Sequence, residues 1–196
     1  MKKLLVVCVI LIITVLSVCF AAEFSDTNGH WGETYINALA DKGIINGYTD
    51  GTFKPNGTIK KGEFLKLVMT TFMPDYDWNQ ENVAYKHWAG IYMEAAMQQG
   101  VIGIDYVDES NVNEEISRGD VVNILGKCDI IIAQNPQDGT AMEFYDVDDL
   151  DEETFAMLSH CVASVYIAGY NDATFKPDKT LTRAEVATIL YRYLNK

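Results

Sequence analysis

Apolar residues recur along this chain at three- and four-residue spacing in six stretches, a pattern typical of amphipathic helices. Gly43 follows the first stretch and Gly100 the third, and a glycine so placed commonly ends a helix. Asp50-Gly51 marks a turn between the first two stretches, and the second helix is expected to begin near Ile59. The pattern predicts a mainly α protein built from helix–loop–helix units. The six apolar faces consist of Tyr35, Ile36, Leu39 and Ala40; Phe64, Leu67 and Val68; Ile91, Tyr92, Ala95 and Ala96; Val121, Ile124, Leu125 and Cys128; Met157, Leu158, Cys161 and Val162; and Val186, Ile189, Leu190 and Tyr193.

The loop between the first two predicted helices occurs twice. Residues 47–55 read GYTDGTFKP, and residues 169–177 read GYNDATFKP, 122 positions later. Residues 59–63 match residues 181–185 at the same offset. Ordered self-similarity of this kind is the signature of a repeat architecture.

A weaker copy lies between these two. His30-Trp31 recurs as His87-Trp88, and residues 59–63 recur as 116–120, both 57 positions later. One unit of this size has little core alone, whereas three packed together bury their apolar faces jointly. Three units would fill the chain after residue 22 and leave no segment for a separate catalytic domain. The expected units are 23–80, 81–140, which is degenerate, and 141–196.

The first 22 residues have the layout of a secretory signal peptide. Two lysines precede an almost continuous apolar run over residues 4–18, and small residues follow at positions 21 and 22. The run is short for a membrane span, which needs about 20 residues. An uncleaved anchor is one alternative. Lipidation at Cys19 is another, because residues 16–19 resemble a lipobox, although a bulky valine precedes the cysteine.

Composition narrows the range of partners. The net charge is −13, and it becomes −15 without the two lysines of the signal. Such a protein repels nucleic acid and anionic membranes at long range, so neither is an expected partner. If it binds an anion, a local basic site must do so against this overall field.

Cysteine, histidine and acid patterns indicate no metal or cofactor. Cys128 and Cys161 remain after the signal, both among apolar residues, and two buried thiols are expected, with an extracellular disulfide as the alternative. The three histidines lack metal-ligand spacing. Six acids over residues 146–153 lack the glycine and ordered spacing of a calcium loop, so a solvated acidic face is expected.

The motifs taken together resemble those of the S-layer homology domain family. They are a His-Trp pair, a Gly-Ile-Ile-x-Gly-Tyr-x-Asp-Gly-Thr-Phe-x-Pro loop and a Thr-Arg-Ala-Glu helix start, which the first and third copies match well. The resemblance implies a pseudo-threefold bundle of three repeats, whose grooves bind secondary cell-wall polysaccharide that often bears pyruvate ketals. It also implies that the arginine of the Thr-Arg-Ala-Glu motif is the main ligand contact. That position holds Lys61, Arg118 and Arg183 in the three copies.

This chain departs from the family pattern at three places. Lys61 keeps the charge but lacks the planar fork that grips a carboxylate bidentately. Residues 104–110 replace the Gly-Tyr-x-Asp-Gly-Thr-Phe loop in the second copy, and the third copy lacks the His-Trp pair. One or two of the implied grooves are therefore expected not to function.

The Thr-Arg-Ala-Glu segment also has a local explanation. Thr182 and Glu185 are spaced as a capping box, and Ser117 and Asp120 approximate the same arrangement. Capping does not explain the basic residue, because a cation at the first helical position opposes the helix dipole. A guanidinium beside free backbone N–H groups would form an anion site suited to a carboxylate-bearing sugar. The alternative is a surface salt bridge to one of the many acids.

Three further pairs of residues complete the candidate ligand site. The tryptophans could stack on sugar rings, although core packing is the more common role. The aspartates could bind ligand or brace a neighbouring repeat, and bracing is favoured. The glycines are expected to serve the backbone of the turn. The pairs are Trp31 and Trp88, Asp26 and Asp146, and Gly47 and Gly169.

The leading hypothesis is a secreted, non-catalytic protein that binds secondary cell-wall polysaccharide and is located at the wall or S-layer of a bacterium. The alternative is a structural or partner-binding surface protein whose repeats have lost glycan binding. An enzyme ranks third, since no nucleophile with a paired base appears and no catalytic residue is proposed.

Overall fold

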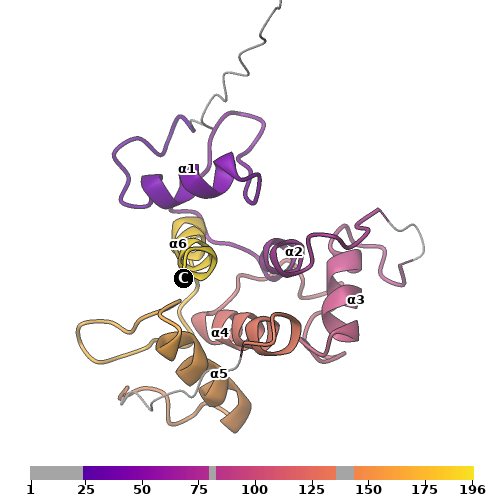
Figure 1. The fold of residues 1–196 in the computed structure, drawn as a ribbon, viewed down its shortest axis with the longest axis vertical. Coiled ribbons are helices and arrows are strands. Elements are labelled where there is room, and N and C mark those ends of the chain that lie inside the picture. Colours follow the sequence, from indigo (N-terminus) through magenta and orange to yellow (C-terminus); the bar gives the residue numbers. More distant parts are fainter. Residues whose placement is uncertain (1–23, 80–82, 136–143) are drawn as a thin grey trace, which may run out of the picture.

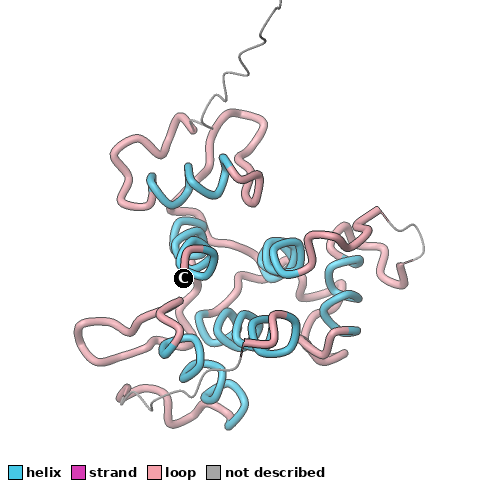
Figure 2. Tube along the Cα trace, in the orientation of Figure 1, coloured by secondary structure: helices cyan, strands magenta, loops and turns pink. Residues whose placement is uncertain are grey.

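A computed structural model describes residues 24–79, 83–135 and 144–196, and the predicted signal peptide lies outside this part of the chain. The described residues form helices joined by long loops and contain no β-strand (Figure 2), which confirms the prediction of a mainly α protein. The second helix begins at Lys61, two residues after the predicted start near Ile59. The elements are α1 (Glu33–Asp41), α2 (Lys61–Phe72), α3 (Gly90–Gln98), α4 (Arg118–Lys127), a π-helical turn η1 (Cys128–Ile132), α5 (Glu152–Ala163) and α6 (Arg183–Leu194).

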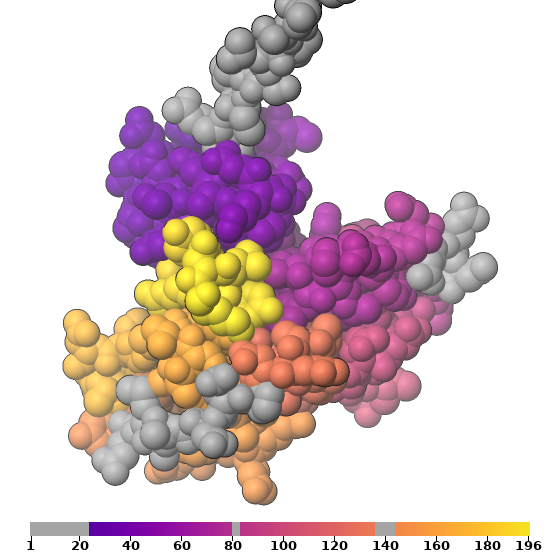
Figure 3. Space-filling model, in the orientation of Figure 1, coloured from indigo at the N-terminus to yellow at the C-terminus, as the bar shows by residue number. Residues whose placement is uncertain are grey.

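Three inner helices lie at the centre of the molecule, and three outer helices surround them (Figure 1). The inner helices are α2, α4 and α6, and the outer ones are α1, α3 and α5. Each outer helix packs on an inner helix from a different helix–loop–helix unit: α1 on α6, α3 on α2, and α5 on α4. The space-filling view shows the resulting lobes with α6 set between them (Figure 3). Among the described helices, the two helices of one helix–loop–helix segment do not form a closely packed pair.

The segments before the inner helices meet in a closed ring of backbone hydrogen bonds. The N–H of Ile59 donates to the carbonyl of Leu181 at 3.2 Å, and the N–H of Leu181 donates to that of Ile116 at 3.3 Å. The N–H of Ile116 then donates to the carbonyl of Ile59 at 3.0 Å and completes the ring. All three side chains are buried. The ring therefore satisfies polar backbone groups at a place where water is excluded.

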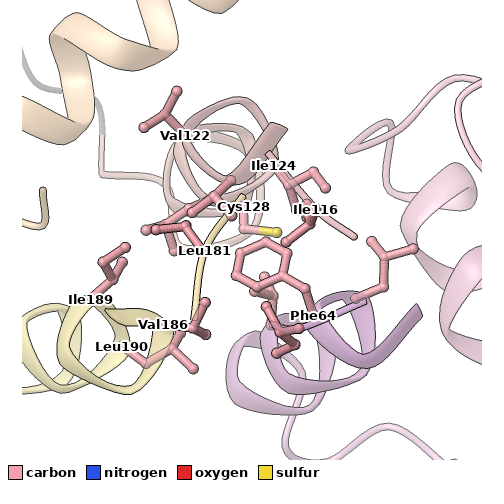
Figure 4. Packing of buried hydrophobic residues seen from close by; sticks show 14 of the residues in the cluster. Phe64, Ile116, Val122, Ile124, Cys128, Leu181, Val186, Ile189 and Leu190 are labelled. Carbon is pink, nitrogen blue, oxygen red and sulfur yellow. The ribbon is translucent and has the colours of Figure 1, made fainter. Parts of the chain in front are cut away.

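One continuous hydrophobic core includes residues of every α-helix. Its centre lies between the three inner helices, where Phe64, Ile116, Leu181 and Val186 point toward one another (Figure 4). Cys128 and Cys161 are buried free thiols, as predicted, and burial raises the pKa of both. Among the described residues, no helix is both long enough and apolar enough to cross a membrane.

The outer helices end on a left-handed residue, but the third does so without glycine. Gly43 and Gly100 follow α1 and α3 with φ of +70° and +73°, as their positions predict. Val165 occupies the equivalent place after α5 with φ of +63°, and its side chain is 71% exposed. A β-branched residue is strained in this conformation.

We expect Val165→Gly to raise the free energy of unfolding by about 1 kcal/mol. A non-glycine residue in the left-handed region costs of order 1–3 kcal/mol, and the greater freedom of glycine in the unfolded chain offsets part of the gain. Urea unfolding at an unchanged m-value measures the gain. The reciprocal Gly43→Val should destabilise by a similar amount. A Val165→Gly protein no more stable than the parent would show that the backbone there carries no strain.

Candidate functional site

The start of each inner helix meets the loop of another unit. We name each contact by the basic residue that opens the helix: the Arg183 junction (α6 with residues 46–57), the Arg118 junction (α4 with residues 168–179) and the Lys61 junction (α2 with residues 106–114). Thr182 and Ser117 form the predicted capping boxes with Glu185 and Asp120. These caps fix where each basic side chain leaves its helix.

The backbone donors at the helix starts are not free, contrary to the sequence-based expectation. The N–H groups of Arg183 and Ala184 donate to the carbonyls of Gly57 and Pro55 at 2.8 and 3.0 Å. The first two N–H groups of α4 and α2 donate in the same way to carbonyls of residues 177 and 179, and of 112 and 114. Because loop carbonyls accept these N–H groups, the groups are not available to bind an anion at the helix N-termini, as the sequence had suggested.

Arg183 binds the first loop through its side chain. Its Nε donates to the carbonyl of Phe53 at 2.8 Å, and its Nη2 donates to that of Asn46 at 3.1 Å. The guanidinium also lies over the rings of Phe53 and Tyr48, with centroids at 4.5 and 5.0 Å. It is only partly buried. Arg183 thus holds two units together while part of its fork stays accessible.

Arg118 makes the same contacts but is only 5% exposed. Its Nε donates to the carbonyl of Phe175 at 2.8 Å, and its Nη2 donates to that of Ala168 at 3.0 Å. The rings of Phe175 and Tyr170 lie at 4.5 and 5.0 Å. Burial lowers the pKa of this guanidinium, although it stays charged. Both arginines therefore bind backbone carbonyls. The sequence had suggested either a guanidinium free to bind an anion or a surface salt bridge, and neither matches this arrangement.

Lys61 is engaged by an acid instead of by carbonyls. Its Nζ lies 3.0 Å from Oε2 of Glu114, and the ring centroid of Tyr106 lies at 5.8 Å. The lysine side chain is 16% exposed. Its charge is thus compensated within the protein.

The aspartate and glycine pairs shape the loops of the first and third units. Asp26 accepts from the N–H groups of Phe53 and Lys54, both at 2.8 Å, and Asp146 makes equivalent bonds at 2.7 Å. The predicted bracing of a neighbouring repeat is not what these bonds show, because each aspartate binds the loop that follows it within its own helix–loop–helix segment. A Cβ on Gly47 would lie 2.4 Å from the Phe24 ring, and one on Gly169 only 2.1 Å from the Phe144 ring. Close ring packing therefore requires these glycines.

The tryptophans do not pack in the core, so the role favoured from sequence is wrong. Trp31 is 58% exposed and Trp88 is 51% exposed. Trp88 lines a groove of about 210 Å³ at the Arg183 junction, together with Asn46, Glu63 and Lys66. The sequence did not indicate these last three as site residues. Of the three, only Glu63 lies in a recurring segment, residues 59–63 with 116–120 and 181–185, and that recurrence is the signal that could have indicated it.

The remaining candidates are structural. Acids 148–153 are exposed, as expected, and Asp151 caps α5 by accepting from the N–H of Thr154 at 2.9 Å. Among the described residues, no group of histidine, cysteine or acid side chains is arranged to hold a metal ion. The predicted signal peptide, including Cys19, lies outside the described residues.

A buried carboxylate that the periodicity did not reveal links three elements. Asp129 in η1 is fully buried and accepts from the Tyr166 hydroxyl at 2.6 Å, His160 Nε2 and Asn135 Nδ2 at 3.0 Å, and Lys196 Nζ at 3.1 Å. Burial alone would raise the pKa of Asp129, but these hydrogen bonds outweigh it and hold the pKa below its ordinary value. The sequence signal was a lone acid within an apolar run.

Comparison with known proteins finds a family similarity in two parts of the chain. The model of the S-layer homology domain matches residues 23–65 and 160–187. The chain is 28% identical to S-layer protein EA1 of Bacillus anthracis over 170 residues, or 83% of this chain and 19% of that protein. It is 25% identical to an amylopullulanase of Thermoanaerobacterium thermosulfurigenes over 177 residues, or 88% of this chain and 10% of the enzyme.

A shorter match concerns an anchoring protein. The chain is 44% identical to a cellulosome-anchoring protein of Acetivibrio thermocellus over 46 residues. The match covers 24% of this chain and 10% of that protein. The chain spans less than a fifth of the length of the curated relatives it matches. These relatives agree with the expected location at the bacterial cell surface. The chain is therefore similar to the S-layer homology domain over residues 23–65 and 160–187.

Proposed function

We propose that this protein attaches non-covalently to the bacterial cell wall by binding a pyruvylated secondary polysaccharide, and that it does so without catalysis. The observation that carries the proposal is the groove at the Arg183 junction, where a partly buried guanidinium and an exposed tryptophan flank the same 210 Å³ space. The cellulosome-anchoring and S-layer relatives support attachment to the cell surface.

The chemistry of the groove suits an acidic sugar. A guanidinium has five N–H donors, and Arg183 directs only two of them to carbonyls. The remaining donors can bind the carboxylate of a pyruvate ketal through charge-assisted hydrogen bonds. Lys66 adds a second cation to the lining, and Trp88 offers a face for a sugar ring. A local basic site of this kind is needed because the chain as a whole is acidic.

We infer that residues 23–80, 81–140 and 141–196 are three repeats arranged with pseudo-threefold packing. The cyclic pairing of outer and inner helices supports this inference. The closed hydrogen-bond ring of Ile59, Ile116 and Leu181 supports it as well, because the three residues occupy matching positions in the repeats.

We expect Trp88→Ala to weaken the affinity of the purified secreted protein for bacterial wall sacculi by up to about tenfold, measured by co-sedimentation, since loss of one aromatic contact face costs about 0.5–1.5 kcal/mol. Extraction of the secondary polysaccharide from the walls should abolish pelleting of the parent. Tyr145→Ala is the matched control, because Tyr145 is 81% exposed and lies outside the groove lining. Pelleting that survives both extraction and Trp88→Ala would contradict glycan anchoring.

The alternative function is a scaffold that holds a protein partner. Arg118 is buried and Lys61 is paired with Glu114, so two of the three basic residues already have internal roles. Under this alternative, pelleting would be unaffected by removal of the wall polysaccharide. The same sedimentation experiment therefore separates the two functions.

A further inference from the structure

One backbone position recurs at all three junctions with a different side chain each time. Its carbonyl accepts the first N–H of the inner helix, at 2.8 to 2.9 Å. We call it the gate position. It is Gly57 at the Arg183 junction, Lys179 at the Arg118 junction and Glu114 at the Lys61 junction.

At the Lys61 junction the gate side chain neutralises the cation. Glu114 places Oε2 3.0 Å from Nζ of Lys61, and this lysine lies beside the Tyr106 ring. An incoming carboxylate would have to displace that of Glu114, whose side chain is 62% exposed and whose backbone carbonyl accepts the N–H of Lys61. The site is therefore occupied by the protein itself.

At the Arg118 junction the gate side chain lies near the aromatic ring on which the arginine lies. Lys179 Nζ is 2.6 Å from Oε1 of Glu185 and 5.8 Å from the centroid of Tyr170. Lys176 lies over the same ring at 4.3 Å, but Lys54 lies over Tyr48 at 4.1 Å, so this contact does not distinguish the Arg118 junction from the Arg183 junction. Arg118, beneath them, is 5% exposed, so an incoming ligand has little access to its guanidinium.

At the Arg183 junction the gate position has no side chain. Gly57 is exposed, and its φ lies outside the left-handed region, so its backbone does not require glycine. A Cβ built there would lie 3.2 Å from the carbonyl oxygen of Lys54 and 4.0 Å from Cδ of Arg183. A longer side chain at residue 57 would thus start beside the guanidinium that borders the groove.

We infer that the gate position selects the ligand-binding junction, so that this protein carries one open site, at Arg183, and two that its own side chains close. The inference rests on the proposed function. It assigns a specificity-determining role to Gly57, Glu114 and Lys179, none of which needs to touch the ligand.

The first test places the closing side chain in the open junction. Gly57→Glu should pair with Arg183 as Glu114 pairs with Lys61, and should weaken binding to wall sacculi by about tenfold or more. Gly57→Ala is the control, because it adds the Cβ without the carboxylate, and it should pellet like the parent. Urea unfolding of both variants checks that the fold is kept. Parent-like pelleting of folded Gly57→Glu would overturn the gate, while loss of pelleting on polysaccharide extraction would still support anchoring.

The reverse test opens the closed junctions. Polysaccharide fragments released from the same walls should bind the parent at one site per chain in calorimetry. The variant that combines Lys179→Gly with Glu114→Gly should bind more than one. Unchanged stoichiometry with unchanged affinity would contradict the gate. Weaker binding in this variant would also contradict it, because it would make the lysine or glutamate a ligand contact. A parent that binds no fragment and does not pellet would instead refute the proposed function.

Discussion

Asp129→Ala is expected to lower the free energy of unfolding by about 3–5 kcal/mol, because each buried donor that loses this acceptor costs about 1–3 kcal/mol. The variant leaves His160 and Tyr166 buried without the acceptor that joins η1 to α5 and the following loop. It also releases Lys196 at the end of α6. Urea unfolding measures the loss. Asp129→Asn is the matched variant: it keeps the shape and one acceptor oxygen, so it should lose less.

The effect of Asp129 should depend on pH in a defined direction. Its pKa is lower in the folded protein than the unfolded value near 3.9, so the folded state favours the ionised form. The stabilisation is therefore complete above about pH 4 and is lost as the pH falls further through the folded pKa. The difference in stability between the parent and Asp129→Ala should shrink below pH 4. A difference that stayed constant down to pH 2, or a loss below about 1 kcal/mol at pH 7, would contradict this role for the carboxylate.

Arg118→Ala is expected to cost about 3–4 kcal/mol of unfolding free energy, because each hydrogen bond from a charged donor contributes about 1.5–3 kcal/mol and two are lost. The carbonyls of Phe175 and Ala168 would lose their donor at the junction between α4 and the third unit. Arg118→Lys should recover part of the loss, since a lysine keeps the charge but cannot bridge both carbonyls. Arg183→Ala should cost less, because Arg183 is more exposed.

Equal losses for Arg118→Ala and Arg183→Ala would show that burial does not distinguish the two arginines. The prediction also bears on how binding is tested. Removal of both arginines would weaken the fold as well as the site, so a loss of wall pelleting in that double variant would not identify a ligand contact. Trp88 and Gly57 are better probes, because Trp88 is 51% exposed and a substitution at Gly57 removes no side chain.

The sequence predicted the helices well, because an apolar stripe reports which face of a helix is buried. It did not reveal which helix covers that face. Tyr35 and Leu39 mark the inner side of α1, yet the partner is α6, more than 140 residues away. Periodicity carries no information on partners at such separation. Only the repeat offsets indicated that the units must pack together.

The candidate site was predicted less well, for reasons visible at single residues. Arg118 and Arg183 were identified by position, but their hydrogen bonds end on backbone carbonyls, which every residue carries and no motif marks. The free donors expected at the helix starts are satisfied in the same way. Trp88 was expected in the core because indole rings are mostly buried, and its exposure depends on the groove that three separate segments form.

The packing of α1 on α6 has a consequence for the order in which the molecule forms. In a chain exported from its N-terminus, α1 emerges before α6. The apolar face of α1 therefore lacks its partner until α6 has followed it, and contacts of such long sequence separation form slowly. The pairs α2 with α3 and α4 with α5 lie closer in the sequence, so we expect them to form sooner. The groove at Arg183 needs α6 for its lining, and we therefore expect it to be completed only when α6 is in place.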